Sequence, residues 1–222
     1  MVNILLDYYD IDSPWLFDSL KRYIKPHHKV AVIAFSFRES RVKNLSDWDF
    51  LYGGKSSRFY SGLTGALSAY GIKEENIQFL NYFTDTKETA AEKIRSADIL
   101  YFLGGLPDKM YERLKEFDLL DVIMKHNGIV MGYSAGAVIQ LAQYHLSPDD
   151  DYPALGYYEG LPMLRDFYIE VHYENTDIQN AAIKSVLKEK KKTVYAFSLG
   201  KGAIIAENGE IQLLGDVKTF KP

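Results

Sequence analysis

The pentapeptide Gly132–Gly136, which reads Gly-Tyr-Ser-Ala-Gly, directly follows the apolar run Ile129–Met131. This order predicts a buried strand that enters a sharp turn and continues as a helix. Small residues around Ser134 allow a strained bend that would push the serine hydroxyl out of the sheet edge. Glycine and serine also populate ordinary turns, so it is the preceding strand that favours a nucleophilic Ser134.

Short apolar runs alternate with longer amphipathic segments before residue 141. The expected strands span residues 4–6, 30–35, 77–80, 99–103 and 129–131, and the expected helices include residues 16–24, 59–70 and 108–117. This alternation predicts a mostly parallel α/β sheet with helices on both sides. Functional loops then lie at the carboxyl ends of the strands, where the Ser134 turn and the Gly104–Gly105 turn both fall.

The pattern changes beyond residue 141. We expect a loop over residues 147–153, extended segments to about residue 173, a helix over residues 178–190 and short strands at 194–197 and 203–205. The 222 residues contain no repeat and no low-complexity linker, so we expect a single domain, 1–222.

Composition excludes several functions. The formal charge is −4 with both signs scattered, and no basic stripe or patch predicts binding to nucleic acid or to an anionic membrane. The chain has no cysteine, which excludes disulfides, zinc–thiolate sites and a cysteine nucleophile. No signal peptide and no apolar stretch of membrane-spanning length are evident, so a cytoplasmic protein is expected.

A serine nucleophile needs a base within hydrogen-bond reach, and histidine is the candidate. Of the five histidines, His27 and His28 lie in a loop at the opposite end of the sheet, and His126 lies at a predicted helix C-terminus. His145 falls in or just past the helix that the serine opens, about three turns away. His172, at the end of an extended segment, remains as the predicted base.

The sequence does not identify which acidic residue would orient the imidazole. The candidates are carboxylates on both sides of the histidine, namely Asp151, Glu170, Glu174, Asp177 and Glu207. For an oxyanion hole, the N–H of Ala135 is the natural first donor, and Gly104–Gly105 can supply the second because glycine lets the backbone approach a ligand closely.

Three segments in order resemble the aspartyl dipeptidase (peptidase E) family, which includes the cyanophycinases. They are Phe102–Gly105, the hexapeptide Gly132–Ala137 with its Gly-x-Ser-Ala-Gly-Ala pattern, and His172-Tyr173. The resemblance covers most of the chain. It implies a three-layer α/β/α fold related to class I glutamine amidotransferases, with a serine at the nucleophile elbow.

The resemblance also implies roles for individual residues. Ser134 would be the nucleophile, His172 its base, and Gly105 and Ala135 the donors to the oxyanion. Asp151 matches a functionally implicated aspartate in the loop after the elbow helix. Two departures concern specificity and the acid: the segment 173–182 contains no arginine for an acidic substrate side chain, and Ser198–Lys201 stands where some members contribute a late acidic residue.

We therefore expect a serine hydrolase that cleaves an amide bond in a dipeptide or similarly small substrate, without a metal or organic cofactor. The alternative is a catalytically silent protein that binds a small molecule or peptide in the same pocket. An ester hydrolase of another α/β arrangement is disfavoured, because few residues follow the serine. A homodimer is compatible with the sequence, which does not determine the oligomeric state.

Overall fold

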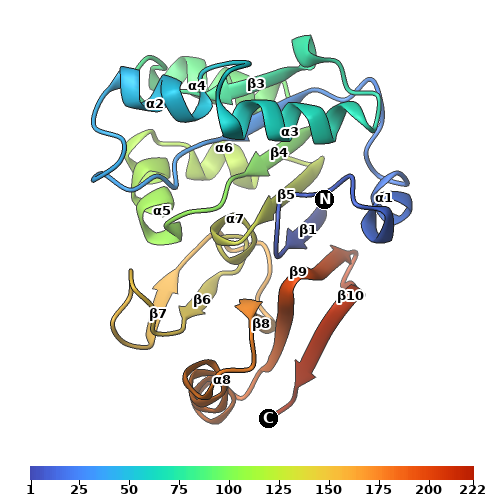
Figure 1. The fold of residues 1–222 in the computed structure, drawn as a ribbon, viewed down its shortest axis with the longest axis vertical. Coiled ribbons are helices and arrows are strands. Elements are labelled where there is room, and N and C mark those ends of the chain that lie inside the picture. The colour runs from blue at the N-terminus through green and yellow to red at the C-terminus, as the bar shows by residue number, and fades with distance from the viewer.

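The computed structural model describes residues 1–222 and contains one large sheet with helices on both faces (Figure 1). The strands of this sheet are β1 (Val2–Leu6), β2 (Val30–Ile33), β3 (Ile77–Leu80), β4 (Ile99–Phe102), β5 (Ile129–Tyr133), β8 (Phe167–Tyr173), β9 (Thr193–Glu207) and β10 (Glu210–Phe220). A separate antiparallel hairpin joins β6 (Gln143–Leu146) to β7 (Gly156–Glu159).

The helices lie between these strands. They are α1 (Pro14–Leu20), α2 (Leu45–Tyr52), α3 (Arg58–Ser68), α4 (Lys87–Arg95), α5 (Pro107–Glu116), α6 (Leu120–Met124), α7 (Ala135–Val138) and α8 (Asp177–Lys190), with a short 3-10 helix at Glu74–Asn76. None of them combines the length and the apolar character that a membrane-spanning helix needs. Helices α2 and α6 are additions to those that the sequence predicts.

The strand order is β10-β9-β1-β5-β4-β2-β3, and β8 pairs with the first half of β9. All pairs among β1, β5, β4, β2 and β3 are parallel, as is the β8–β9 pair. Only β9 runs antiparallel to its neighbours β1 and β10. The predicted mostly parallel sheet is confirmed, and the carboxyl ends of β1, β4 and β5 meet at one edge.

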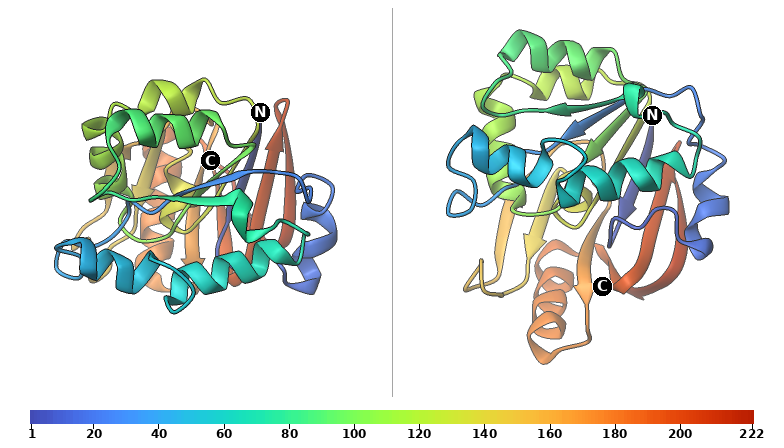
Figure 2. Two further views of the ribbon diagram at one scale, coloured as in Figure 1. Left: turned by 90° about the horizontal axis from the view of Figure 1, so that it is seen from above. Right: turned by 45° about the horizontal axis from the view of Figure 1, so that its top comes forward.

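Two layers of helices cover the sheet (Figure 2). Helices α1, α2 and α3 bury side chains such as Leu16 and Leu67 against one face. Helices α4, α5 and α6 bury Ile94 and Leu114, among others, against the opposite face. Burying one such aliphatic side chain contributes about 2 kcal/mol to the free energy of folding. Between the two helix layers, strands β2 and β4 are buried along their whole length. This three-layer α/β arrangement agrees with the predicted fold class.

Two parts of the second half differ from the sequence-based expectation. The helix after Ser134 has only four residues, and His145 lies on strand β6, which follows that helix. The two short strands expected near the C-terminus are parts of the single fifteen-residue strand β9. Strand β10 was not predicted at all, because as an exposed edge strand it lacks the apolar pattern of a buried one.

Candidate active site

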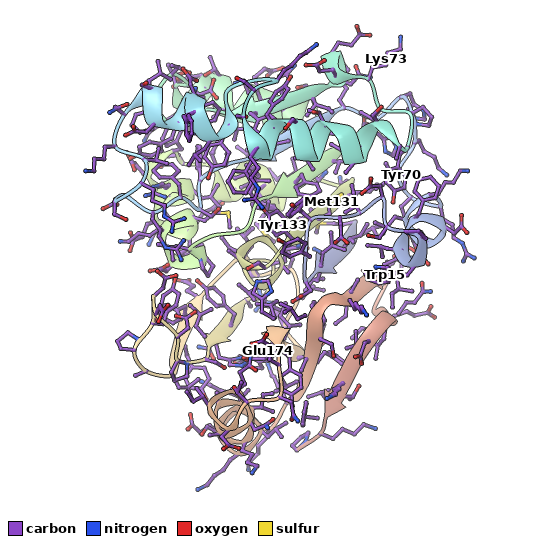
Figure 3. The ribbon with its side chains drawn as sticks, viewed as in Figure 1. Trp15, Tyr70, Lys73, Met131, Tyr133 and Glu174 are labelled. Atoms are coloured by element: carbon purple, nitrogen blue, oxygen red, sulfur yellow. The ribbon has the colours of Figure 1, made fainter.

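The carboxyl ends of β1 and β5 bring Asp7 and Ser134 next to each other. The two strands are parallel neighbours in which Leu6 lies opposite Tyr133, and the Ser134 N–H donates to the Leu6 carbonyl at 3.0 Å. Figure 3 labels Tyr133 at this edge, immediately before the serine. The residues that follow both strands therefore occupy the same end of the sheet, as parallel pairing requires.

The backbone at Ser134 is strained. Its φ of 51° and ψ of −116° are rare for a residue other than glycine. The flanking glycines are required by close packing. A Cβ on Gly132 would lie 2.4 Å from the Gly136 carbonyl oxygen, and one on Gly136 would lie 2.0 Å from the Phe102 carbonyl oxygen. The Gly-x-Ser-x-Gly pattern thus lets the turn pass close to β4 and leaves Ser134 half-buried at the edge of the sheet.

The hydroxyl of Ser134 lies within hydrogen-bond distance of His172. The distance from Ser134 Oγ to His172 Nε2 is 2.8 Å, although 38 residues separate the two in sequence. On the other side of the ring, His172 Nδ1 lies 3.3 Å from Asp7 Oδ1. Serine, imidazole and carboxylate therefore stand in the order that activates a serine as a nucleophile.

The main chain holds His172 in this position. The pairing of β8 with β9 shifts register between Glu170 and Tyr173, and His172 within that irregularity has a φ of 53°. Its N–H donates to Asp7 Oδ1 at 2.6 Å, and its carbonyl accepts from Gln179 Nε2 at 2.9 Å. A bulge of this kind re-aims a side chain, here toward the serine.

Opposing effects act on the protonation of His172. Burial lowers the pKa of the imidazole, but the adjacent Asp7 carboxylate, together with the negative charges of Glu170 and Glu174, outweighs burial. The pKa is therefore raised above its ordinary value of 6.5. The surroundings therefore favour the protonated form of the His172 ring.

Two backbone N–H groups in the cavity beside Ser134 are free of backbone hydrogen bonds. Gly105 and Ala135 line the same cavity as Ser134, and neither N–H donates to a backbone carbonyl. Gly105 has a φ of 140°, and a Cβ on it would lie 2.3 Å from the Ser36 carbonyl oxygen, so only glycine fits there. The buried Ser36 also donates from Oγ to the Gly104 carbonyl at 2.6 Å, which fixes the turn.

The cavity beside Ser134 has a volume of about 270 Å³. Its walls come from the Gly105 turn, the start of α7, strands β6 and β8, and the segment Ser147–Tyr152, which we call the cavity loop. Two contacts hold the cavity loop over the sheet: Asp151 pairs with Arg38, and the Tyr152 hydroxyl donates to Asp108 at 2.6 Å. The volume suits a single residue or a small peptide.

The structure brings together Ser134, His172, Gly105 and Ala135, but it does not bring Asp151 to the imidazole. The Asp151 carboxylate lies in the cavity wall and pairs with Arg38, whose hydrogen bond lowers the pKa of Asp151. Asp7 occupies the position beside the ring that the sequence left open. Gly104 does not line the cavity, and it supplies the carbonyl that Ser36 holds.

The other acids considered from the sequence make no hydrogen bond or ion pair with the His172 ring. Glu170 bonds to His145 and Ser147, and Glu207 accepts a bond from Tyr23. Asp7 was not among the candidate acids, because all of those candidates follow Ser134 in the sequence. The available signal was the place of Asp7 directly after the first apolar strand, at the edge that also holds the Ser134 and Gly105 turns. No group of three or more histidine and carboxylate side chains is arranged to hold a metal ion.

Comparison with known proteins agrees with this fold. The model of peptidase family S51 matches residues 55–214, well over half of the chain. A putative peptidase E from Listeria monocytogenes EGD-e has a similar structure with a TM-score of 0.65 at 20% identity, over 100% of this chain and 98% of that one. A peptidase from an acI-B1 Actinobacterium has a TM-score of 0.66 at 17% identity, over 99% and 93%. A search of curated proteins finds no match.

The chain belongs to peptidase family S51. It is accordingly a serine-type peptidase, and the match leaves its specificity undefined. The predicted peptidase E-like family is thereby confirmed. The relation to glutamine amidotransferases stays a prediction.

Proposed function

We propose that this peptidase hydrolyses an amide bond of a dipeptide or similarly small substrate through Ser134, His172 and Asp7. The observation that supports this most directly is the 2.8 Å contact between Ser134 Oγ and His172 Nε2 beside a small cavity. Ser134, at its strained turn, acts as the nucleophile of an elbow. Asp7 orients the ring and stabilises its protonated form.

The reaction takes place in two steps. Ser134 Oγ attacks the carbonyl carbon while its proton passes to His172 Nε2, and the N–H groups of Gly105 and Ala135 stabilise the oxyanion. The C–N bond then breaks as the imidazolium gives that proton to the leaving amine. A water molecule, deprotonated by the same imidazole, next attacks the acyl-enzyme ester. The ester C–O bond then breaks as the imidazolium returns its proton to Ser134 Oγ, which releases a carboxylic acid and restores the serine.

Hydrolysis of a dipeptide library by the purified protein tests this proposal. Mass analysis identifies the cleaved peptides, and kcat/KM is then measured for wild type, Ser134→Ala and His172→Ala. Loss of either group removes the nucleophile or its base, so kcat/KM falls by a factor of about 10³ or more. Hydrolysis that survives in both variants would refute the assignment, and no hydrolysis in any protein would favour the silent binder.

A further inference from the structure

The Glu170 carboxylate is a buried charge that the proposed catalytic steps do not use. Its side chain is 6% exposed and lines the cavity beside Ser134. Oxygen Oε2 bonds to His145 Nε2 at 2.7 Å and to Ser147 Oγ at 2.8 Å. The structure gives Oε1 no hydrogen-bond partner within the protein. Glu170 is therefore held rigidly from one side and left unsatisfied on the other.

A carboxylate in such a position calls for a positively charged partner. Removing a charge from water is costly unless the charge is paired and fully hydrogen-bonded. No lysine or arginine lines the cavity, whereas Asp149 and Asp151 line it together with Glu170. The Asp151 carboxylate already has Arg38 as its counter-ion, and Asp149 Oδ1 accepts two N–H groups of the cavity loop. Asp149 and Asp151 are exposed, whereas Glu170 is buried, so Glu170 Oε1 is the buried carboxylate oxygen left for a ligand.

We propose that the cavity selects substrates whose acyl residue carries a positively charged nitrogen, which pairs with Glu170 Oε1. This inference rests on the proposed function, because the cavity that Glu170 lines also contains Ser134, Ala135 and Gly105. The acyl part stays covalently attached to the serine after the first step, so it is the part that the enclosed cavity must hold. An acidic acyl side chain would meet three carboxylates and no lysine or arginine there.

Two sources can supply the charged nitrogen, the free α-amino group or a basic side chain. A panel of chromogenic amides distinguishes these two sources. It contains the lysyl, norleucyl and aspartyl amides of one chromogenic amine, each with a free and with an acetylated α-amino group. If the side chain pairs with Glu170, lysyl substrates exceed norleucyl ones at least tenfold in kcat/KM. If the α-amino group does, acetylation costs tenfold or more. Equal rates for acetyl-norleucyl and free lysyl amides, or a preference for aspartyl amides, would overturn the proposal.

Glu170→Gln is the matching variant, because glutamine keeps an oxygen for His145 and Ser147 while removing the charge. We expect the preference for the charged substrate to fall at least tenfold, mainly through KM, since the lost contact binds substrate. Glu174→Gln, which removes an exposed carboxylate just past His172 (Figure 3), should change that preference less than about twofold. A Glu170→Gln enzyme with an unchanged preference for the charged substrate would contradict the proposal. If this variant does not fold, the rates of the wild-type enzyme on the substrate panel test the proposal instead.

Labelling by a fluorophosphonate separates this inference from the proposed function. The reagent reports on Ser134 and His172 without needing a charged group in the cavity. Labelling of Ser134 with no preference for charged substrates would reject the Glu170 subsite alone. Absence of both labelling and hydrolysis would reject the proposed function, and the subsite with it.

Discussion

The Asp7 carboxylate is almost completely buried, and no lysine or arginine pairs with it. Its charge is stabilised by two backbone N–H groups, from His172 to Oδ1 and from Gly200 to Oδ2, both at 2.6 Å. These two contacts fix the Asp7 carboxylate in place, with Oδ1 at 3.3 Å from His172 Nδ1.

Replacing Asp7 with Asn separates the charge of this residue from its shape. Because Asp7 is the main group that raises the pKa of His172, and burial acts in the opposite direction, the variant's imidazole has a lower pKa. The base works in its neutral form, so the acid limb of the kcat/KM profile moves to lower pH. The plateau falls by a factor of about 10² to 10⁴, because the imidazolium loses its partner. An acid limb that stays in place would argue against this role.

Ser36 is a positioning residue for the Gly105 turn, since its hydroxyl donates to the Gly104 carbonyl. In Ser36→Ala the turn loses a buried hydrogen bond that contributes about 1 kcal/mol. We expect kcat to fall several-fold with little change in KM, because a displaced Gly105 N–H weakens transition-state stabilisation. Steady-state kinetics test this, and a change in KM alone would contradict it.

The residues that act at the site differ in how far the sequence predicts them. Ser134 and His172 follow from a motif and from elimination among a few histidines. Asp7 could not be chosen in this way, because acidic residues are common and the bend of β8 that brings His172 toward β1 depends on a register shift. Glu170 was considered as the orienting acid, but its contacts with His145 became evident only in three dimensions.

At the scale of elements, the β5–α7 turn depends on contact between main chains. A Cβ at Gly136 would lie 2.0 Å from the Phe102 carbonyl oxygen, so Gly136→Ala should destabilise the protein by several kcal/mol. Gly65→Ala is the matched control, because Gly65 lies in α3 with open space around it. There alanine should stabilise by up to about 1 kcal/mol. Urea unfolding of both variants measures the two changes, and equal free energies of unfolding would contradict this reading.

Burial also explains which elements the sequence predicts. Strands β2, β4 and β5 are buried along their whole length, so they read as continuous apolar runs. Glycines at 200 and 202 interrupt the apolar pattern of β9. The sequence therefore predicts two short strands where the structure has one. The early end of α7 depends on a tertiary contact: the N–H of Ala142, just past the helix, donates to the Leu164 carbonyl.

For the whole molecule, the cavity depends on contacts between distant segments. Arg38, after β2, holds the cavity loop through Asp151. Both side chains are about one-third exposed, so the pair contributes little to stability and Arg38→Met should lower Tm by less than about 4 °C. A freed loop should nevertheless raise KM several-fold while kcat stays similar. Lys87→Met, which breaks an exposed pair with Asp118 far from the cavity, is the control.

The arrangement of the site as a whole is tested by the intact mass of the protein after treatment with a fluorophosphonate. The account predicts one adduct on wild type, mapped to Ser134 by peptide analysis. It predicts none on Ser134→Ala, and labelling slowed by at least tenfold in His172→Ala and Asp7→Asn. An adduct on another residue, or equal labelling rates in wild type and His172→Ala, would contradict the claim that these three side chains act together.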